Sequence, residues 1–287
     1  MGIQDFPSDL LLYLLSTYLL DDILAVKSCS LVCKRLREVF QPQVLRNIVV
    51  RYSSHGAQGT AVGQNIESTF ASIAPHIRHL TISCNVMPLP DTCVEALEKE
   101  VVAQLPQMRK LATLVISGDK LPLTHKEETF LVLDSFKYRS IPPLTSIRVL
   151  VLHKIYLPIS TDIFWSFPNL DTLALVGIVL ENSTLPNHEG HSSEPQKRSA
   201  IQDLTVHLFT ENMTFFLKWG GGTECQLDLT DMKNFRVSMA AHKESMVAMR
   251  DVFLPSCGQA LETLDLHLFD YREQYAFCCI SQSSSQY

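Results

Sequence analysis

The sequence predicts an α+β protein, in which a small unit of three helices is followed by repeated strand units that form a mainly parallel sheet. Two observations support this fold class. An apolar run and a stripe at helical spacing fill the first fifty residues, and one six-residue pattern recurs seven times after residue 76. The chain has 287 residues, 46% of them hydrophobic, and this is enough to bury a sizeable core.

Charge and cysteine content narrow the classes of function. The net charge is −6 and no run of five like charges occurs, so we expect no nucleic-acid partner. The apolar run from Leu10 to Leu20 follows Asp5 and Asp9 and is shorter than the roughly 20 residues that cross a membrane, so we expect neither a signal peptide nor a membrane segment. The eight cysteines form no CxxC pair, which favours reduced thiols in the cytoplasm or nucleus.

The first predicted helix covers about residues 8 to 18. Pro7 can open a helix because its missing N–H would be unpaired there, and Asp9 suits the positive end of the helix dipole. Beside a broad leucine stripe, Leu12, Tyr13 and Leu19 extend the apolar surface around the helix. One small core cannot cover all of these side chains, so we expect a partner to cover some of them.

A second helical stretch is expected after Asp21 and Asp22. Its apolar residues recur at helical spacing: Ala25, Cys29, Val32, Cys33, Leu36 and Phe40. Zinc needs at least three protein ligands and no further Cys or His lies nearby, so Cys29 and Cys33 are interpreted as packed side chains. The basic residues Lys34, Arg35 and Arg37 lie off the stripe and are expected at the surface.

Together these segments resemble an F-box. That family combines a Leu-Pro pair, a Leu-rich helix, an acidic break and a Val-Cys-basic segment, which are matched here by "FP" at 6–7, "DLLLYLL" at 9–15, "DDIL" at 21–24 and "LVCKRL" at 31–36. The match covers about residues 4 to 48, and "SCSLVCKRL" is especially similar to the expanded F-box families of fungi. Phe6 stands where Leu is usual, and Leu36 where an aromatic residue is common.

The resemblance implies binding to the Skp-family adaptor and, through it, to cullin and RING subunits. The positions that match the motif are the expected adaptor contacts: Phe6, Pro7, Leu10, Leu11, Leu14, Leu15, Ile23, Leu24, Val32, Cys33 and Lys34.

After a polar segment at 51–65, the pattern apolar-x-x-apolar-x-apolar recurs at intervals of 23 to 36 residues. Its copies begin at Ile77, Leu111, Ile147, Leu170, Ile201, Met232 and Leu261. Such alternation predicts a short strand with one buried face, and the rest of each cycle has room for a helix, as at Thr92–Leu105 and Met246–Leu254. Stacked units of this kind bury one continuous core.

This part resembles an irregular leucine-rich-repeat solenoid with a curved, mainly parallel sheet. The expected division is therefore an adaptor-binding helical unit at 1–50, a linker at 51–76 and a repeat domain at 77–287. The fourth and sixth pattern residues should point inward, while alternate residues form a concave face that binds a target protein. The expected contacts on that face are His79, Thr81, Ser83, Thr113, Ser117, His153, Asp203, His207, Arg236, Asp265 and His267.

No catalytic or cofactor motif accompanies these units. "HEGH" lies in a breaker-rich loop at 182–199 without further ligands, and "WGGGTE" at 219–224 lacks the Lys-Ser/Thr of a phosphate loop. We therefore expect no metal, no cofactor and no enzymatic activity in the chain itself. After the last strand, residues 271–280 are expected to form a minimal cap unless the C-terminus is shortened.

The sequence thus favours a substrate-recognition subunit of a cullin–RING ubiquitin ligase, acting in the cytoplasm or nucleus. Two alternatives stay open at this point. One is an F-box scaffold that acts outside ubiquitination, and the other is an unrelated α/β enzyme, which would show a deep pocket with convergent titratable groups.

Overall fold

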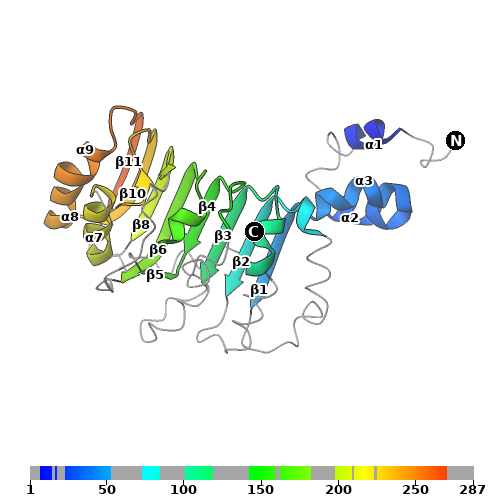
Figure 1. Ribbon diagram of the computed structural model, residues 1–287, viewed down its shortest axis with the longest axis horizontal. Coiled ribbons are helices and arrows are strands. Elements are labelled where there is room, and N and C mark those ends of the chain that lie inside the picture. Colours follow the sequence, from blue (N-terminus) through cyan, green and yellow to red (C-terminus); the bar gives the residue numbers. More distant parts are fainter. Residues whose placement is uncertain are drawn as a thin grey trace.

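The computed structural model describes residues 7–14, 17, 23–52, 73–84, 101–118, 142–158, 162–181, 198–208, 210–222 and 225–269. Within these residues the chain is an α+β protein. Three helices come first, a long parallel sheet follows, and further helices lie along the C-terminal half of the sheet (Figure 1).

The N-terminal helices are α1 (Ser8–Leu14), α2 (Ile23–Val32) and α3 (Lys34–Val44). Four residues form their own small core, separate from the core of the sheet: Leu11, Val26, Leu36 and Phe40. Cys29 and Cys33 are half-buried against this core, as expected for packed thiols.

The helical stretch expected from Ala25 to Phe40 is divided between two helices, because the chain breaks at Cys33 and α3 begins at Lys34. The break changes the phase of the helical stripe, so apolar residues before and after it no longer share one face. As a result, Val32 is 68% exposed and does not belong to the buried stripe.

The main sheet contains eight strands side by side in chain order, all parallel, and it does not close on itself. The strands are β1 (Asn47–Tyr52), β2 (His79–Cys84), β3 (Thr113–Gly118), β4 (Val149–His153), β6 (Thr172–Glu181), β8 (Asp203–Leu208), β10 (Asn234–Ala240) and β11 (Thr263–Phe269). A short strand β5 (Tyr156–Pro158) pairs with the end of β6, while β7 (Ser199–Ala200) and β9 (Leu227–Asp228) pair with each other.

All seven predicted strands are present in the sheet. Each begins two residues after the first apolar residue of its pattern, as His79 follows Ile77. The register is the same between neighbours, so that His79 faces Thr113 and Thr113 faces Val149. Equivalent repeat positions therefore lie next to one another across the sheet.

The sheet begins at Asn47, earlier than the sequence analysis expected. Strand β1 crosses the expected boundary at residue 50 and extends into the expected linker, and Asn47 pairs with His79. Its Ile48 and Val50 pack against the main core in the places that the fourth and sixth pattern residues occupy in other strands.

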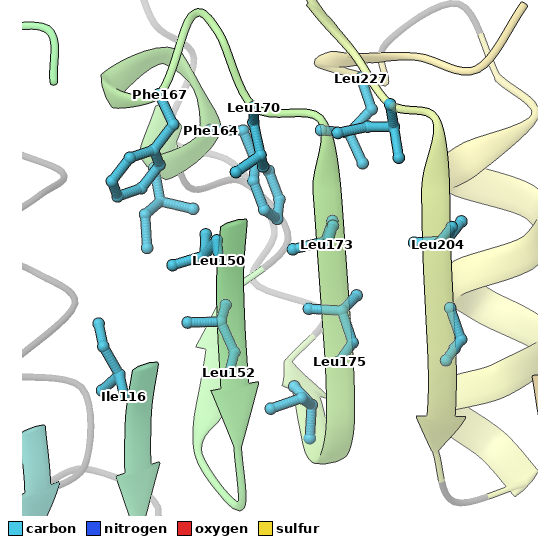
Figure 2. Packing of buried hydrophobic residues seen from close by; sticks show 14 of the residues in the cluster. Ile116, Leu150, Leu152, Phe164, Phe167, Leu170, Leu173, Leu175, Leu204 and Leu227 are labelled. Carbon is cyan, nitrogen blue, oxygen red and sulfur yellow. The ribbon is translucent and has the colours of Figure 1, made fainter. Parts of the chain in front are cut away.

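The inward direction of the fourth and sixth pattern residues is confirmed. From β2 to β10 these residues are at most 2% exposed. Figure 2 shows Leu150, Leu152, Leu173 and Leu175 in adjacent rows, with Phe164 packed over them from the 3-10 helix η6 (Asp162–Ser166). Strand β11 is the exception, because Leu264 and Leu268 on the same side of the sheet are each 43% exposed. The expected cap at 271–280 lies outside the described residues.

The connections differ from the expected helices in part. Of the helix expected at Thr92–Leu105, the described end is a 3-10 helix, η5 (Val102–Gln107), which contains Pro106, and a proline lacks the N–H that a continuing α-helix needs. The helix expected at Met246–Leu254 is present as α8 (Lys243–Ala248), a π-turn η7 (Met249–Phe253) and α9 (Leu254–Ser256). A further short helix, η4 (Ala74–His76), precedes β2.

Helix α7 (Thr210–Gly220) was not predicted. It contacts β6, β8 and β10 and buries Met213, Phe216 and Leu217 in the main core. Three residues with spacings of three and one thus supply its inward face, which is typical of an amphipathic helix.

Candidate interaction surfaces

Apolar side chains on the N-terminal helices form the first candidate surface. Leu24, Leu31 and Val32 of α2 are 69%, 75% and 68% exposed. Their spacings of seven and eight residues place them on one side of the helix. We define the helical apolar surface as these residues together with the exposed apolar residues of α1, which are Leu10, Leu12 and Tyr13.

This exposure has a simple physical cause. Among the described residues, the core of the helical unit holds four buried side chains, and so small a core leaves other apolar residues of the unit at its surface. Clustered exposed apolar side chains are typical of protein interaction sites, because burying a leucine contributes about 1.5–3 kcal/mol.

The structure divides the expected adaptor contacts into different environments. Leu10, Leu24 and Val32 belong to the helical apolar surface, while Leu11 is only 1% exposed and fills the core of the helical unit. Pro7 and Lys34 are exposed, and Lys34 Nζ lies 4.0 Å from Glu38 Oε1. Leu14 and Cys33 are half-buried. Phe6 and Leu15 lie outside the described residues, as does the side chain of Ile23.

Three residues of the helical apolar surface were not among the expected contacts: Leu12, Tyr13 and Leu31. Leu12 and Tyr13 already extended the apolar surface of the first predicted helix. Leu31 precedes Val32 in the "LVCKRL" segment, and only the helix break at Cys33 reveals that both side chains are exposed.

The second candidate surface is the sheet face opposite the main core, which we call the half-exposed face. It consists of the alternate strand residues that begin at Asn47, His79 and their equivalents in the other strands. All eleven expected target contacts lie on it, each half-buried or exposed.

Hydrogen bonds between neighbouring strands hold some of these side chains. Ser117 Oγ lies 2.9 Å from His153 Nδ1, and Asn234 Nδ2 donates to Asp203 Oδ1 at 2.6 Å. Both pairs join residues at equivalent positions of adjacent repeats. Their side chains are therefore presented in fixed positions rather than as freely rotating groups.

Apolar residues occupy the middle of the half-exposed face. Val115, Val151 and Ala174 are direct neighbours on β3, β4 and β6, and Val149 and Val176 lie beside them. All five are half-buried. The middle of the face therefore offers a shallow apolar area, with polar and charged residues on the strands to either side.

Two histidines on this face have altered acid–base properties. Burial, followed by the charge of His267, lowers the pKa of His207, whose ring centroid lies 6.3 Å from that of Phe269. Burial also lowers the pKa of His79, with further contributions from Arg46 and Arg78. Both histidines therefore favour the neutral form.

The described residues were compared with the requirements of a metal site and of a reactive thiol. They contain no cluster of three or more His, Cys, Asp or Glu residues that could hold a metal ion. Burial raises the pKa of the Cys225 and Cys257 thiols to about 11, which disfavours the reactive thiolate. The "HEGH" segment lies outside the described residues.

Neither a protein-family model nor a curated protein matches this chain. In the part of the chain that the structure describes, no helix is both long enough and apolar enough to span a membrane.

Proposed function

We propose that this chain is a substrate receptor of a cullin–RING ubiquitin ligase, with an F-box formed by α1–α3 and a leucine-rich-repeat domain formed by the sheet. The observation that carries the proposal is the cluster of Leu24, Leu31 and Val32 on a helical unit that has its own small core. The sequence resemblance at residues 4–48 gives this surface a specific partner, the Skp-family adaptor.

The parallel sheet supports the second half of the proposal. Parallel strands in chain order and in one register, with repeated apolar residues on one face, are typical of a repeat solenoid. The half-exposed face then presents one side chain from each repeat at equivalent positions, an arrangement that suits recognition of a protein surface.

The chain would act by proximity and supply no reacting group. An adaptor on α1–α3 and a target on the half-exposed face would be held in one complex, so that target lysines meet the ubiquitin-charged enzyme at a raised effective concentration. This division of roles fits the two separate hydrophobic cores.

The test compares the wild-type chain with the double variant Leu31→Asp/Val32→Asp in cells that express the Skp-family adaptor. Proteins captured by the tagged chain with the proteasome blocked are identified, and their half-lives are then measured without the block. We expect captured targets to be ubiquitinated and short-lived with the wild type and to persist with the double variant, because two carboxylates in an apolar interface cost several kcal/mol, of order 2–7.

The control is Arg37→Asp, which also lowers the net charge by two but replaces an exposed polar residue of α3. It should leave target half-lives unchanged. Targets that bind the wild type yet keep the same half-life with and without the double substitution would contradict a ubiquitination role and favour a scaffold.

A further inference from the structure

The residues that directly precede the main strands form a continuous row along one edge of the sheet. From Arg46 to Lys233, the carbonyl of this residue accepts hydrogen bonds from two backbone N–H groups at the start of the next strand, as Arg46 O does from Arg78 and His79 at 2.9 and 3.0 Å. We call this the entry row; it consists of Arg46, Arg78, Ala112, Arg148, Asp171, Gln202, Lys233 and Glu262.

Two neighbouring pairs in the entry row have opposite charges. Arg148 has Asp171 as its next neighbour, with Nη1 3.3 Å from Oδ1, and Lys233 is followed by Glu262. Arg46 and Arg78 are different, because two positive side chains come next to each other and the next position is Ala112. Like charges at adjacent positions of a sheet are unfavourable, so this pair is a place where an anion would relieve repulsion.

The described residues of the strands next to the pair, and of their described connections, contain no acidic side chain. Residues 45–52, 73–84, 101–118 and 142–158 contain no Asp or Glu, whereas the described residues after 198 contain both signs. Both arginines also act on His79, the first residue of β2 on the half-exposed face, so their positive potential reaches the surface proposed to bind the target.

An apolar side chain lies beside this basic edge. Val49 of β1 is exposed on the half-exposed face and pairs with Thr81, which in turn pairs with Val115. A ligand at this end of the sheet therefore meets two arginines at the edge and the exposed side chain of Val49 further along β1.

We propose that the Arg46–Arg78 pair binds the carboxylates of an acidic segment of the target protein, with an apolar side chain of that segment on Val49. The inference rests on the proposed function, since it specifies the chemistry of the target. Guanidinium groups suit carboxylates because their paired N–H donors match the two carboxylate oxygens.

The test uses a short fluorescein-labelled peptide rich in Glu and Val and follows its anisotropy as the full chain is added. Arg46→Gln/Arg78→Gln should raise the Kd about tenfold, the order expected for two exposed charge contacts. Lysine at both positions should keep most of the affinity, and added salt should weaken the wild type more than the Gln variant.

The matched control is Lys233→Gln/Lys243→Gln, which removes the same charge from the C-terminal half of the chain, includes the entry-row position equivalent to Arg46 and leaves the half-exposed face intact. It should change the Kd by less than about twofold, within the range of long-range screening effects. Equal losses in both double variants, or no loss in the Arg46/Arg78 variant, would overturn the proposal.

Two further readouts separate this inference from its alternatives. A single-stranded oligonucleotide of equal charge that binds more tightly than the peptide, and through the same arginines, would overturn the proposal that the ligand is a protein segment.

Adaptor binding is measured on the same samples and should be unaffected by the Gln substitutions. If the adaptor fails to bind while peptide recognition persists, the proposed ligase role is wrong and the acidic-segment site stands.

Discussion

Leu11 and Leu31 offer a direct way to separate the core of the helical unit from its proposed docking surface. Leu11 is 1% exposed and Leu31 is 75% exposed, although they are the same residue type in adjacent helices. Replacement by alanine removes three carbon atoms, each worth about 0.8 kcal/mol when buried. Scaled by its present exposure, full coverage of Leu31 by the adaptor corresponds to about 1.8 kcal/mol, or roughly twentyfold in Kd.

Leu31→Ala should therefore weaken adaptor binding about twentyfold and leave folding stability within about 0.5 kcal/mol. Leu11→Ala should instead reduce the stability of the helical unit by about 3 kcal/mol, because it leaves a cavity in the small core that Leu11 shares with Val26, Leu36 and Phe40. Isothermal titration calorimetry with purified adaptor and urea unfolding measure the two quantities on the same proteins. Comparable destabilisation by the two substitutions, or an adaptor affinity within twofold of wild type for Leu31→Ala, would refute this assignment.

Three further predictions concern the sheet. Because burial lowers the pKa of His207, the unfolded chain binds a proton at this side chain more tightly than the folded protein does. The contribution of neutral His207 to folding stability should therefore be fully present above pH 6.5 and fall as the pH drops below it. In urea titrations at several pH values, His207→Gln should flatten this dependence. Leu173→Ala in the main core should lower the free energy of unfolding by about 3 kcal/mol, whereas Thr172→Ala on the opposite face should lower it by under about 0.5 kcal/mol. Equal urea midpoints for the two variants would contradict the burial of only one face of the sheet. With thiol pKa values near 11, Cys225 and Cys257 should react with iodoacetamide at mildly alkaline pH far more slowly than the half-buried cysteine of α2, as followed by peptide mass spectrometry.

The repeating part of the fold was predictable because each copy of the pattern apolar-x-x-apolar-x-apolar forms a strand with one buried face. A buried first residue, such as Ile77, ends the preceding turn, and Leu80 and Ile82 then fill the core from one face of the strand. This signal depends only on the strict two-residue alternation of side chains in a strand, which long-range packing does not change.

Strand β1 was not predicted, although its sequence contains the same apolar-x-x-apolar-x-apolar pattern. "LRNIVV" from Leu45 is a further copy of the pattern, and Ile48 and Val50 hold its fourth and sixth positions. The segment follows directly on α3, so it was assigned to the helical unit. Only the pairing with β2 reveals where the sheet begins.

The helical unit was harder to assign in detail. Helical periodicity placed Val32 and Leu36 on one stripe, but periodicity carries no information about a break, and the interruption at Cys33 turns Val32 to the surface. For the same reason sequence alone could not separate Leu11, which fills the core, from its exposed neighbour Leu10.

The charges of the entry row show a second limit. Arg46 and Arg78 are 32 positions apart in the sequence and become neighbours only through the pairing of β1 with β2. The ion pair of Arg148 with Asp171 depends on the same register between β4 and β6. Pairing of repeats, which a single sequence does not display, decides which charges meet.

The proposed binding of the adaptor to the helical unit is tested most directly by mixing the purified full chain with purified Skp-family adaptor. The mass of the product is measured by light scattering after size-exclusion chromatography. We expect one species with the summed mass of one chain and one adaptor, which persists at concentrations near 1 μM and is lost with Leu31→Asp/Val32→Asp. A Kd in that range corresponds to about 8 kcal/mol. Separate elution of two folded proteins at tens of micromolar, roughly ten times higher, would contradict it.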